Sequence, residues 1–222
     1  MVKVVIANLK KVQLDREVVR SLDGVSDQAV LMDWHDVSWD ELGEHDVFVP
    51  ASLLDSIVND QAFIYHELSL YPFFQEIKAR IIEDGSPSGV FRFRRVVDEA
   101  VNSAIITSDL CVLESIFGQP GNLVLKRSNE DVVPHHVILM VQYKKVIAHI
   151  EYTFSGDESI QIEWSGALKM IEFHSDERTS LKPGGNKLPL SYRIDSILTH
   201  SKKYELVIGT FNTYQKQIEM GG

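Results

Sequence analysis

The chain has 222 residues, of which 22 are lysine or arginine and 32 are aspartate or glutamate, so its formal net charge at pH 7 is −10. This length fits one full domain plus a smaller part and excludes a large multidomain assembly. The acidic balance disfavours nucleic acid as a partner, because such binding depends on many basic contacts with phosphates. Hydrophobic residues make up 44% of the chain, enough for a folded core.

The cysteine content and the apolar runs indicate the compartment. Cys111 is the only cysteine, so no intramolecular disulfide can form, and a reducing cytoplasm is expected. No stretch of about 18 apolar residues is present, which disfavours a membrane span. The first apolar run meets Asn8 and two lysines too soon to form the core of a signal peptide.

The first 60 residues alternate short apolar runs with helical patterns, which predicts a small α/β part. Residues 2–7, 29–34 and 46–49 are expected to be strands, the last ended by Pro50. Helices are expected at residues 14–22, with Val18 and Val19 on one side, and at 51–58, before a turn at Asn59-Asp60. Strand, helix and strand over residues 2–34 would form one βαβ-like unit.

A longer helix is predicted over residues 69–84. Ser69 is the expected cap, Pro72 lies in the first turn, where its missing N–H costs nothing, and Gly85 ends the run. The strand that follows, residues 90–97, has period two, with Phe91 and Phe93 on one face and Arg92 and Arg94 on the other.

The remaining chain is predicted to be one helix, a run of strands and a final helix. The first helix covers residues 107–117, with Thr107 or Ser108 as cap and Gly118 as stop, and it places Asp109 near its N-terminus. Tyr204, Val207, Phe211, Tyr214 and Ile218 have helical spacing and predict the final helix. An antiparallel meander is expected from five apolar segments between them: 123–126, 136–143, 146–154, 159–164 and 169–173.

One of these strands predicts a protein partner. Residues 137–141, Val-Ile-Leu-Met-Val, are apolar at both parities, whereas a strand with one wet face should alternate with polar residues. The helices are enough to cover only one face of the sheet. We therefore expect a second copy of the sheet to cover the other face, in a face-to-face homodimer.

The order of segments after residue 61 has a counterpart in a known family. The segments are the Tyr71-Pro72-Phe73 helix start with its turn at 85–89, the strand 90–97, the helix with Asp109-Leu110 ending in Phe117-Gly118-Gln119-Pro120, and the strand pair around Ser165-Gly166-Ala167. In this order they resemble the C-terminal domain of the Gfo/Idh/MocA family of nicotinamide-dependent sugar and polyol oxidoreductases. The resemblance implies two domains: residues 1–60, a reduced Rossmann-like part, and residues 61–222.

The chain departs from this family where the family's chemistry lies. Family members carry a Gly-x-Gly-x-x-Gly turn that seats the cofactor pyrophosphate at a helix N-terminus, whereas the first 60 residues contain only Gly24 and Gly43. The family's catalytic His lies three residues before the helix-borne Asp, and Ile106 stands there. The family's catalytic Lys lies in a Glu-Lys-Pro segment, and the most similar segment of this chain is the one that ends in Lys10.

The resemblance places Asp109 toward the family's substrate pocket, although an Asp near a helix N-terminus also stabilises its own helix. Tyr65 and His66 are candidates for the same pocket. Arg92 and Arg94, together with Arg95, are candidates to hold an anionic ligand; the alternative is that they pair with acidic neighbours on the sheet.

Two other clusters admit a site or a plain structural role. His135 and His136 suggest a metal, but adjacent strand residues point to opposite faces. The segment Asp33-Trp34-His35-Asp36 suggests an acid–base cluster at a strand end, or simply a solvated strand exit.

The sequence thus predicts an α+β fold: a small N-terminal α/β remnant followed by a large, mostly antiparallel β-sheet with helices on one face. One functional hypothesis is a non-catalytic relative of these oxidoreductases, without cofactor, that dimerises and binds a sugar-like ligand or a partner protein. The other is an oxidoreductase or oxidoreductase subunit that uses NAD or NADP on a sugar or polyol.

Overall fold

The computed structural model describes residues 2–22, 25, 29–43, 45–56, 61–83, 85–98, 102–129, 132–176 and 190–221. Its contacts define two units, Met1–Phe74 with Ser191–Thr213 and Gln75–Leu190 with Tyr214–Gly222. The predicted α+β class is confirmed. The predicted division at residue 60 concerns folding domains and stays a prediction.

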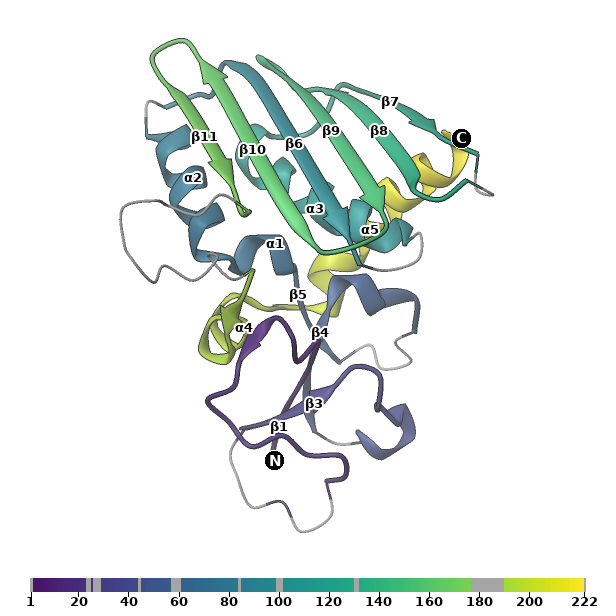
Figure 1. The fold of residues 1–222 in the computed structure, drawn as a ribbon. Helices are drawn as coiled ribbons and strands as arrows, with labels where there is room; N and C mark the ends of the chain where they lie inside the picture. Colours follow the sequence, from purple (N-terminus) through teal and green to yellow (C-terminus); the bar gives the residue numbers. More distant parts are fainter. Residues whose placement is uncertain are drawn as a thin grey trace. The chain divides into compact units, whose positions relative to one another are not determined.

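The first unit contains a five-stranded sheet in the order β13-β5-β4-β1-β3 (Figure 1). Four strands are parallel, and β13 pairs with β5 in the antiparallel direction. The strands are β1 (Lys3–Ala7), β3 (Ala29–Asp33), β4 (Asp46–Pro50), β5 (Phe63–Tyr65) and β13 (Lys202–Lys203). Continuous apolar runs are typical of parallel strands that are buried on both faces, and β1, β3 and β4 are almost entirely buried. The three predicted strands are therefore confirmed.

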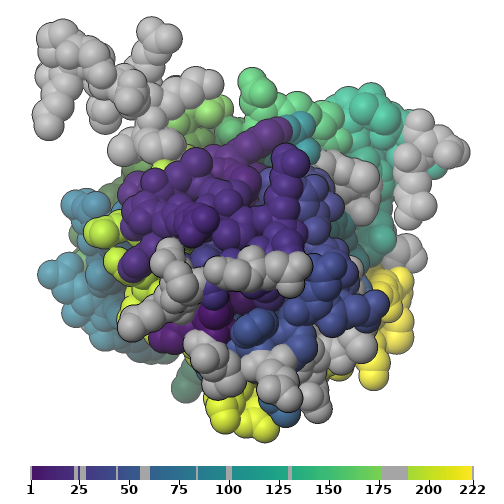
Figure 2. All heavy atoms as spheres, turned by 90° about the horizontal axis from the view of Figure 1, so that it is seen from below, coloured from purple at the N-terminus to yellow at the C-terminus, as the bar shows by residue number. Residues whose placement is uncertain are grey.

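The helix predicted over residues 14–22 is wrong. After β2 (Val12–Gln13), the chain is extended beside β3: the Val19 N–H donates to the Leu31 carbonyl at 2.9 Å, and the Leu31 N–H donates to the Glu17 carbonyl at 2.9 Å. The β-branched valines favour extended backbone, and the edge of β3 supplies hydrogen-bond partners. The described connection from β1 to β3 is thus not helical, and the βαβ-like unit is wrong as well. Much of the face that Figure 2 presents belongs to these N-terminal residues, in purple.

Short elements complete the first unit. The segment predicted as a helix over 51–58 is a 3-10 helix, η2 (Ala51–Ser56); the rest of that segment and the predicted turn at Asn59-Asp60 lie outside the described residues. The sequence pattern did not predict the other elements: η1 (Trp39–Glu41), β12 (Tyr192–Arg193), which pairs with β2 in parallel, and α4 (Ile194–His200).

The helix predicted over 69–84 is divided into α1 (Glu67–Leu70) and α2 (Pro72–Ile82). Tyr71 between them is extended, with ψ 125°, because a residue before proline is disfavoured in the helical region. Ser69 lies inside α1 and its hydroxyl donates to the His66 carbonyl at 2.7 Å. The prediction that Ser69 caps the helix is therefore wrong.

The second unit contains a six-stranded sheet in the order β11-β10-β6-β9-β8-β7. The strands are β6 (Gly89–Val97), β7 (Asn122–Arg127), β8 (His135–Gln142), β9 (Val146–Phe154), β10 (Ser159–Gly166) and β11 (Met170–His174). All neighbours are antiparallel except β6 and β9. The uninterrupted meander is wrong, because β6 lies between β9 and β10, and a parallel pair requires a crossover, here the route from β6 through a helix to β7, β8 and β9.

That helix is α3 (Ser103–Phe117), which begins before the predicted residue 107. Asn102 is its N-cap and accepts from the Ala104 N–H at 2.9 Å. Thr107 and Ser108 are buried inside the helix, so neither is the cap and Asp109 is not in the first turn. The predicted stop at Gly118, which has φ 83°, is confirmed.

The helices cover one face of this sheet. Phe117 of α3 contacts Phe91, Tyr143 and Trp164, with ring centroids 5.2 to 5.8 Å apart. The final predicted helix is confirmed as α5 (Tyr204–Met220); Figure 1 shows α3 behind the strands. The opposite face of the sheet, here called the outer face, carries the side chains that alternate with the buried ones. Among all described helices, none has the length and hydropathy needed to span a bilayer.

Candidate functional site

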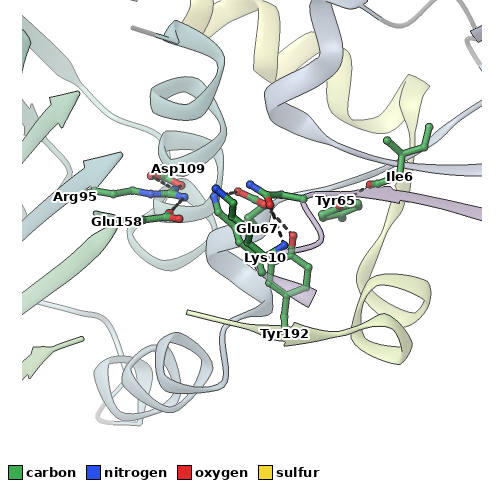
Figure 3. Close-up of polar contacts among 10 residues, drawn as sticks. Ile6, Lys10, Tyr65, Glu67, Arg95, Asp109, Glu158 and Tyr192 are labelled. Atoms are coloured by element: carbon green, nitrogen blue, oxygen red, sulfur yellow. Dashed lines mark hydrogen bonds and ion pairs between the residues drawn. The ribbon is translucent and has the colours of Figure 1, made fainter. Parts of the chain in front are cut away.

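Asp109 lies at the centre of a buried polar cluster in the second unit (Figure 3). The Arg95 Nη1 atom is 3.1 Å from Asp109 Oδ1 and 3.0 Å from Oδ2, and Tyr152 donates its hydroxyl to Oδ2 at 3.0 Å. The Arg95 Nη2 atom is 2.8 Å from Glu158 Oε1. β6 contributes Arg95, α3 contributes Asp109 and β9 contributes Tyr152, so three elements hold the cluster in place.

The centre of this cluster is an ion pair that is closed to solvent. The side chains of Arg95 and Asp109 are each 1% exposed. Burial raises the pKa of Tyr152 well above its usual value, and the negative charge of Asp109 raises it further, so Tyr152 remains a hydrogen-bond donor at neutral pH. Arginine does not release its proton in proteins. Neither residue that contacts the Asp109 carboxylate in this cluster can therefore exchange a proton with a substrate near pH 7.

Arg92 and Arg94 lie on the outer face, opposite to the face on which Arg95 meets Asp109. Arg92 pairs with Glu163 at 3.0 Å, and Arg94 pairs with Glu151 at 2.8 Å. Successive strand residues point to opposite faces, so β6 separates these two arginines from Asp109. The pairing that the sequence left as an alternative is thus present in the structure.

Tyr65 and His66 belong to the first unit, whereas Asp109, Arg92 and Arg94 belong to the second. The Tyr65 hydroxyl donates to the Ile6 carbonyl at 2.8 Å, and burial raises its pKa well above the usual value. Burial, and secondarily the charge of Lys202, lowers the pKa of His66 to about 4. His66 is therefore neutral at pH 7.

A second buried cluster, in the first unit, joins Lys11, Glu67 and Tyr192; Figure 3 labels Glu67 and Tyr192. The Lys11 Nζ atom is 3.3 Å from Glu67 Oε2 and 5.9 Å from the Trp34 ring centroid, and the Tyr192 hydroxyl donates to Glu67 Oε1 at 2.8 Å. Burial, followed by the charge of Glu67, raises the pKa of Tyr192 well above its usual value. Sequence reasoning missed this cluster.

A signal for part of this cluster exists in the sequence. Lys11, Trp34 and Glu67 each follow one of the parallel strands β1, β3 and β5, and the carboxyl ends of parallel strands meet at one edge, where open α/β sheets place functional groups. Tyr192 comes from a distant segment and carries no such signal.

The two remaining candidate clusters have structural roles. Asp33 Oδ1 accepts from the His35 N–H at 3.0 Å, which closes a turn after β3. His135 is buried, with Nδ1 3.2 Å from Ser128 Oγ, whereas His136 is exposed on the outer face. Within the described parts of the chain, no group of three or more His, Cys, Asp or Glu could hold a metal ion.

The residues after β1 do not fit a nicotinamide dinucleotide in the usual mode. That mode requires a glycine turn and a helix N-terminus directly after the first strand. Here a turn at residues 8–11 leads into β2, and the described residues between β1 and β3 form no helix. Ile106, at the position of the family's His, is 1% exposed inside α3. Lys10 is exposed, and its backbone N–H donates to Asn8 Oδ1.

No protein-family model matches the sequence, and no curated protein matches it either. Solved structures do match. The WlbA dehydrogenase of Thermus thermophilus, solved with NAD and UDP-GlcNAcA, is 8% identical with a TM-score of 0.52, over 97% of this chain and 94% of that one. A dehydrogenase from Chromobacterium violaceum is 8% identical with a TM-score of 0.54, over 97% and 94%.

A myo-inositol dehydrogenase from Corynebacterium glutamicum is 10% identical with a TM-score of 0.53, over 97% of this chain and 89% of that one. At such low identity these similarities concern the fold. They confirm at that level the resemblance found in the sequence, so this chain has the fold of the Gfo/Idh/MocA-type dehydrogenases.

Proposed function

We propose that the chain is a non-catalytic relative of these dehydrogenases that acts as a cytoplasmic homodimer and binds a sugar-like ligand or a partner protein. The observation that carries the proposal is the closed ion pair between Arg95 and Asp109. Dehydrogenation of an alcohol requires a group that accepts the hydroxyl proton, and the two groups seen here on the Asp109 carboxylate, the Arg95 guanidinium and the Tyr152 hydroxyl, do not accept one near pH 7. Ile106 has no proton to exchange, and the segment after β1 lacks the glycine turn.

A titration with NAD(H) and NADP(H) tests this proposal, with nucleotide fluorescence as the measure of binding. We expect no saturable binding at micromolar nucleotide, while a Gfo/Idh/MocA-type dehydrogenase binds under the same conditions as the positive control. Saturable micromolar binding would overturn the proposal. It would favour the second candidate, an oxidoreductase or subunit acting on a sugar or polyol, which is supported by two structural neighbours, a dehydrogenase solved with NAD and UDP-GlcNAcA and a myo-inositol dehydrogenase.

The proposed dimer uses the outer face of the six-stranded sheet. Its exposed apolar side chains, each 38 to 68% exposed, are Val90, Val124, Ile138, Met140, Ile147 and Met170. The sheet register makes them neighbours: Val90 is opposite Ile147, and Met140 is opposite Val124. An apolar patch shared by several strands is typical of an interaction surface, and a two-fold contact between identical patches is self-complementary.

Light scattering after size-exclusion chromatography tests the dimer. We expect a dimer for the unchanged chain and a monomer for Ile147→Glu, which places a charge in the patch, opposite Val90. The matched control is Ile82→Glu, because Ile82 on α2 is similarly exposed, 44% against 50% for Ile147, but lies outside the outer face. A stable monomer for the unchanged chain would contradict the proposed dimer.

A further inference from the structure

A hollow of about 170 Å³ lies at one end of the six-stranded sheet, between the end of α2 and the turn that joins β10 to β11. It is here called the hairpin pocket, and all the residues that line it belong to the second unit. Sites for drug-sized ligands measure about 300 to 1,000 Å³. The hairpin pocket therefore has room for one small ring and is too small for a nucleotide.

Trp164 lines the hairpin pocket from the core of the second unit. The side chain is 2% exposed, and its ring stacks on Phe117 of α3 with the ring centroids 5.8 Å apart. Gly166 lines the pocket beside the N–H edge of this indole, where a Cβ would lie 2.6 Å from Nε1. Any other residue at position 166 would cover or displace this edge, so the glycine leaves an indole N–H donor uncovered.

The walls of the hairpin pocket combine apolar atoms with hydroxyl groups. Ile81 and Pro87 supply apolar atoms, and Leu168, which is 81% exposed, lies at the rim. Ser86 and Ser88 are exposed serines of the turn before β6, and each hydroxyl can donate one hydrogen bond and accept two. A sugar ring offers the matching groups, because it carries both C–H groups and hydroxyls that donate and accept.

The charge at the hairpin pocket is already balanced. Among the described residues that line it, Lys169 is the charged one, and its Nζ atom is 3.1 Å from Glu83 Oε2. An acidic ligand would have to compete with Glu83 for Lys169, and the chain as a whole carries −10, which repels anions. A purely apolar ligand would remove water from the hydroxyls and the indole N–H without replacing its hydrogen bonds. A neutral ring with several hydroxyls avoids both costs.

The hairpin pocket is separate from the ion pair of Arg95 and Asp109. Gly166 is opposite Gly89, the first residue of β6. Arg95 lies toward the other end of β6, about 20 Å from Gly89 at about 3.3 Å per residue. The closed ion pair therefore does not block a ligand at the hairpin pocket.

We propose that the hairpin pocket binds one ring of a neutral monosaccharide or cyclic polyol. This inference rests on the proposed function, because it names the site and the chemical class of the sugar-like ligand. The ligand's hydroxyls form hydrogen bonds with Ser86, Ser88 and the Trp164 N–H, and its C–H groups pack on the apolar wall.

The emission of Trp164 tests this inference. The chain has three tryptophans, so the full-length variant W34F/W39F keeps Trp164 alone as a fluorescent probe inside the pocket. The ligands used are D-glucose, D-galactose, D-mannose and myo-inositol. We expect at least one of them to change the emission saturably, with a dissociation constant of about 1 mM or lower, as is usual for a ligand with few atoms.

Variants in the same background locate the ligand. Ala167→Phe adds a ring in the exposed turn that lines the pocket and should abolish the saturable change. S86A/S88A should weaken binding by about two- to tenfold for each lost hydrogen bond. The matched control is S38A, which removes another exposed hydroxyl, one without a capping hydrogen bond in the first unit, and should leave the affinity unchanged. Circular dichroism checks that each variant is folded.

The outcomes separate this inference from the proposed function. Saturable binding that neither Ala167→Phe nor S86A/S88A weakens would overturn the hairpin pocket as the site, while the proposed sugar-like ligand would stand. No response to any of the four ligands would overturn the inference, whereas the nucleotide titration decides the non-catalytic role separately. Tighter binding of D-glucuronate than of D-glucose, with loss of this preference in Lys169→Met, would overturn the neutral class of ligand.

Discussion

Arg95 Nη1 and Asp109 Oδ2 lie 3.0 Å apart, and each of the two side chains is 1% exposed. Water does not reach this ion pair, so removal of one partner leaves the other charge buried and uncompensated. By the resemblance, Asp109 would face the substrate pocket of a dehydrogenase. In this chain it makes a structural contact instead.

Arg95→Met should lower the free energy of unfolding by about 3 to 5 kcal/mol, because Asp109 would be left charged and buried. The double variant Arg95→Met with Asp109→Leu should regain part of this loss, since the buried Asp109 charge is gone while Glu158 and the Tyr152 hydroxyl still lose their contacts with these two side chains. Urea unfolding at pH 7, followed by circular dichroism, measures both values.

The matched control for this prediction is Arg92→Met, which removes an arginine from the same strand. Arg92 is 58% exposed and pairs with Glu163 on the outer face, so its loss should cost less than about 1 kcal/mol. Equal losses for the two single variants would show that the Arg95 pair is no more important than a surface contact.

Alkaline pH should unfold the protein in one cooperative step. The pKa values of five of the seven tyrosines, Tyr65, Tyr143, Tyr152, Tyr192 and Tyr214, are raised, chiefly by burial. A raised folded-state pKa contributes stability that is present below about pH 10, the unfolded value, and is lost as the pH rises above it.

A titration by absorbance at 295 nm, with circular dichroism in parallel, checks the alkaline prediction. Ionisation of most tyrosines should coincide with loss of secondary structure, whereas the chain in concentrated urea should titrate smoothly near pH 10. Complete ionisation while the circular dichroism stays native would contradict the burial of these side chains.

His66 should make the protein less stable in acid. Its pKa is lowered from 6.5 to about 4, first by burial and then by the charge of Lys202, so the unfolded chain binds the proton more readily. The stability that this group contributes is complete above about pH 6.5 and is lost as the pH falls toward 4. The contribution is up to about 3 kcal/mol at about 1.4 kcal/mol per pKa unit.

Urea unfolding at pH 7 and pH 4 of His66→Gln measures that contribution. The variant should lose up to about 3 kcal/mol less on acidification than the unchanged chain. His200→Gln, which changes an exposed histidine of α4, should lose as much as the unchanged chain. The prediction fails if the two variants respond alike.

Two glycines should respond oppositely to alanine. Gly89 has φ 153°, and a Cβ there would lie 2.2 Å from the Ser165 carbonyl oxygen, so Gly89→Ala should destabilise β6 and its pairing with β10. Gly209 lies inside α5, where an added methyl group would meet open space, so Gly209→Ala should stabilise the chain by about 1 kcal/mol. Thermal unfolding of both variants should shift in opposite directions.

The sequence was sufficient to predict the strands of the second unit, because period two marks each of them, but it did not predict that β6 lies between β9 and β10. Phe91 and Phe93 are buried and Arg92 and Arg94 are exposed, as predicted. The same parity places Arg95 among the buried residues, and a buried arginine requires an acidic partner. That signal was present in the sequence, but the identity of the partner depended on the crossover through α3.

Other features depended on tertiary contacts that no local pattern contains. Val18 and Val19 have a helix-like spacing with Leu22, but the open edge of β3 binds the backbone of their segment as an extended chain. The Lys11, Glu67 and Tyr192 cluster joins three segments that are distant in sequence. The expected position of Asp109 at a helix start was wrong because Asn102 caps α3 earlier.

The position of β6 between β9 and β10 has a consequence for synthesis. β6 is the first strand of its sheet to leave the ribosome, yet both of its neighbours lie much later in the chain. Until β9 emerges, the nascent polypeptide presents Phe91 and Phe93 with no sheet around them, and unpaired strand edges of this kind are prone to aggregate. The strand that carries Arg95 is therefore the first of its sheet to be synthesised, and it remains unpaired for the longest part of synthesis.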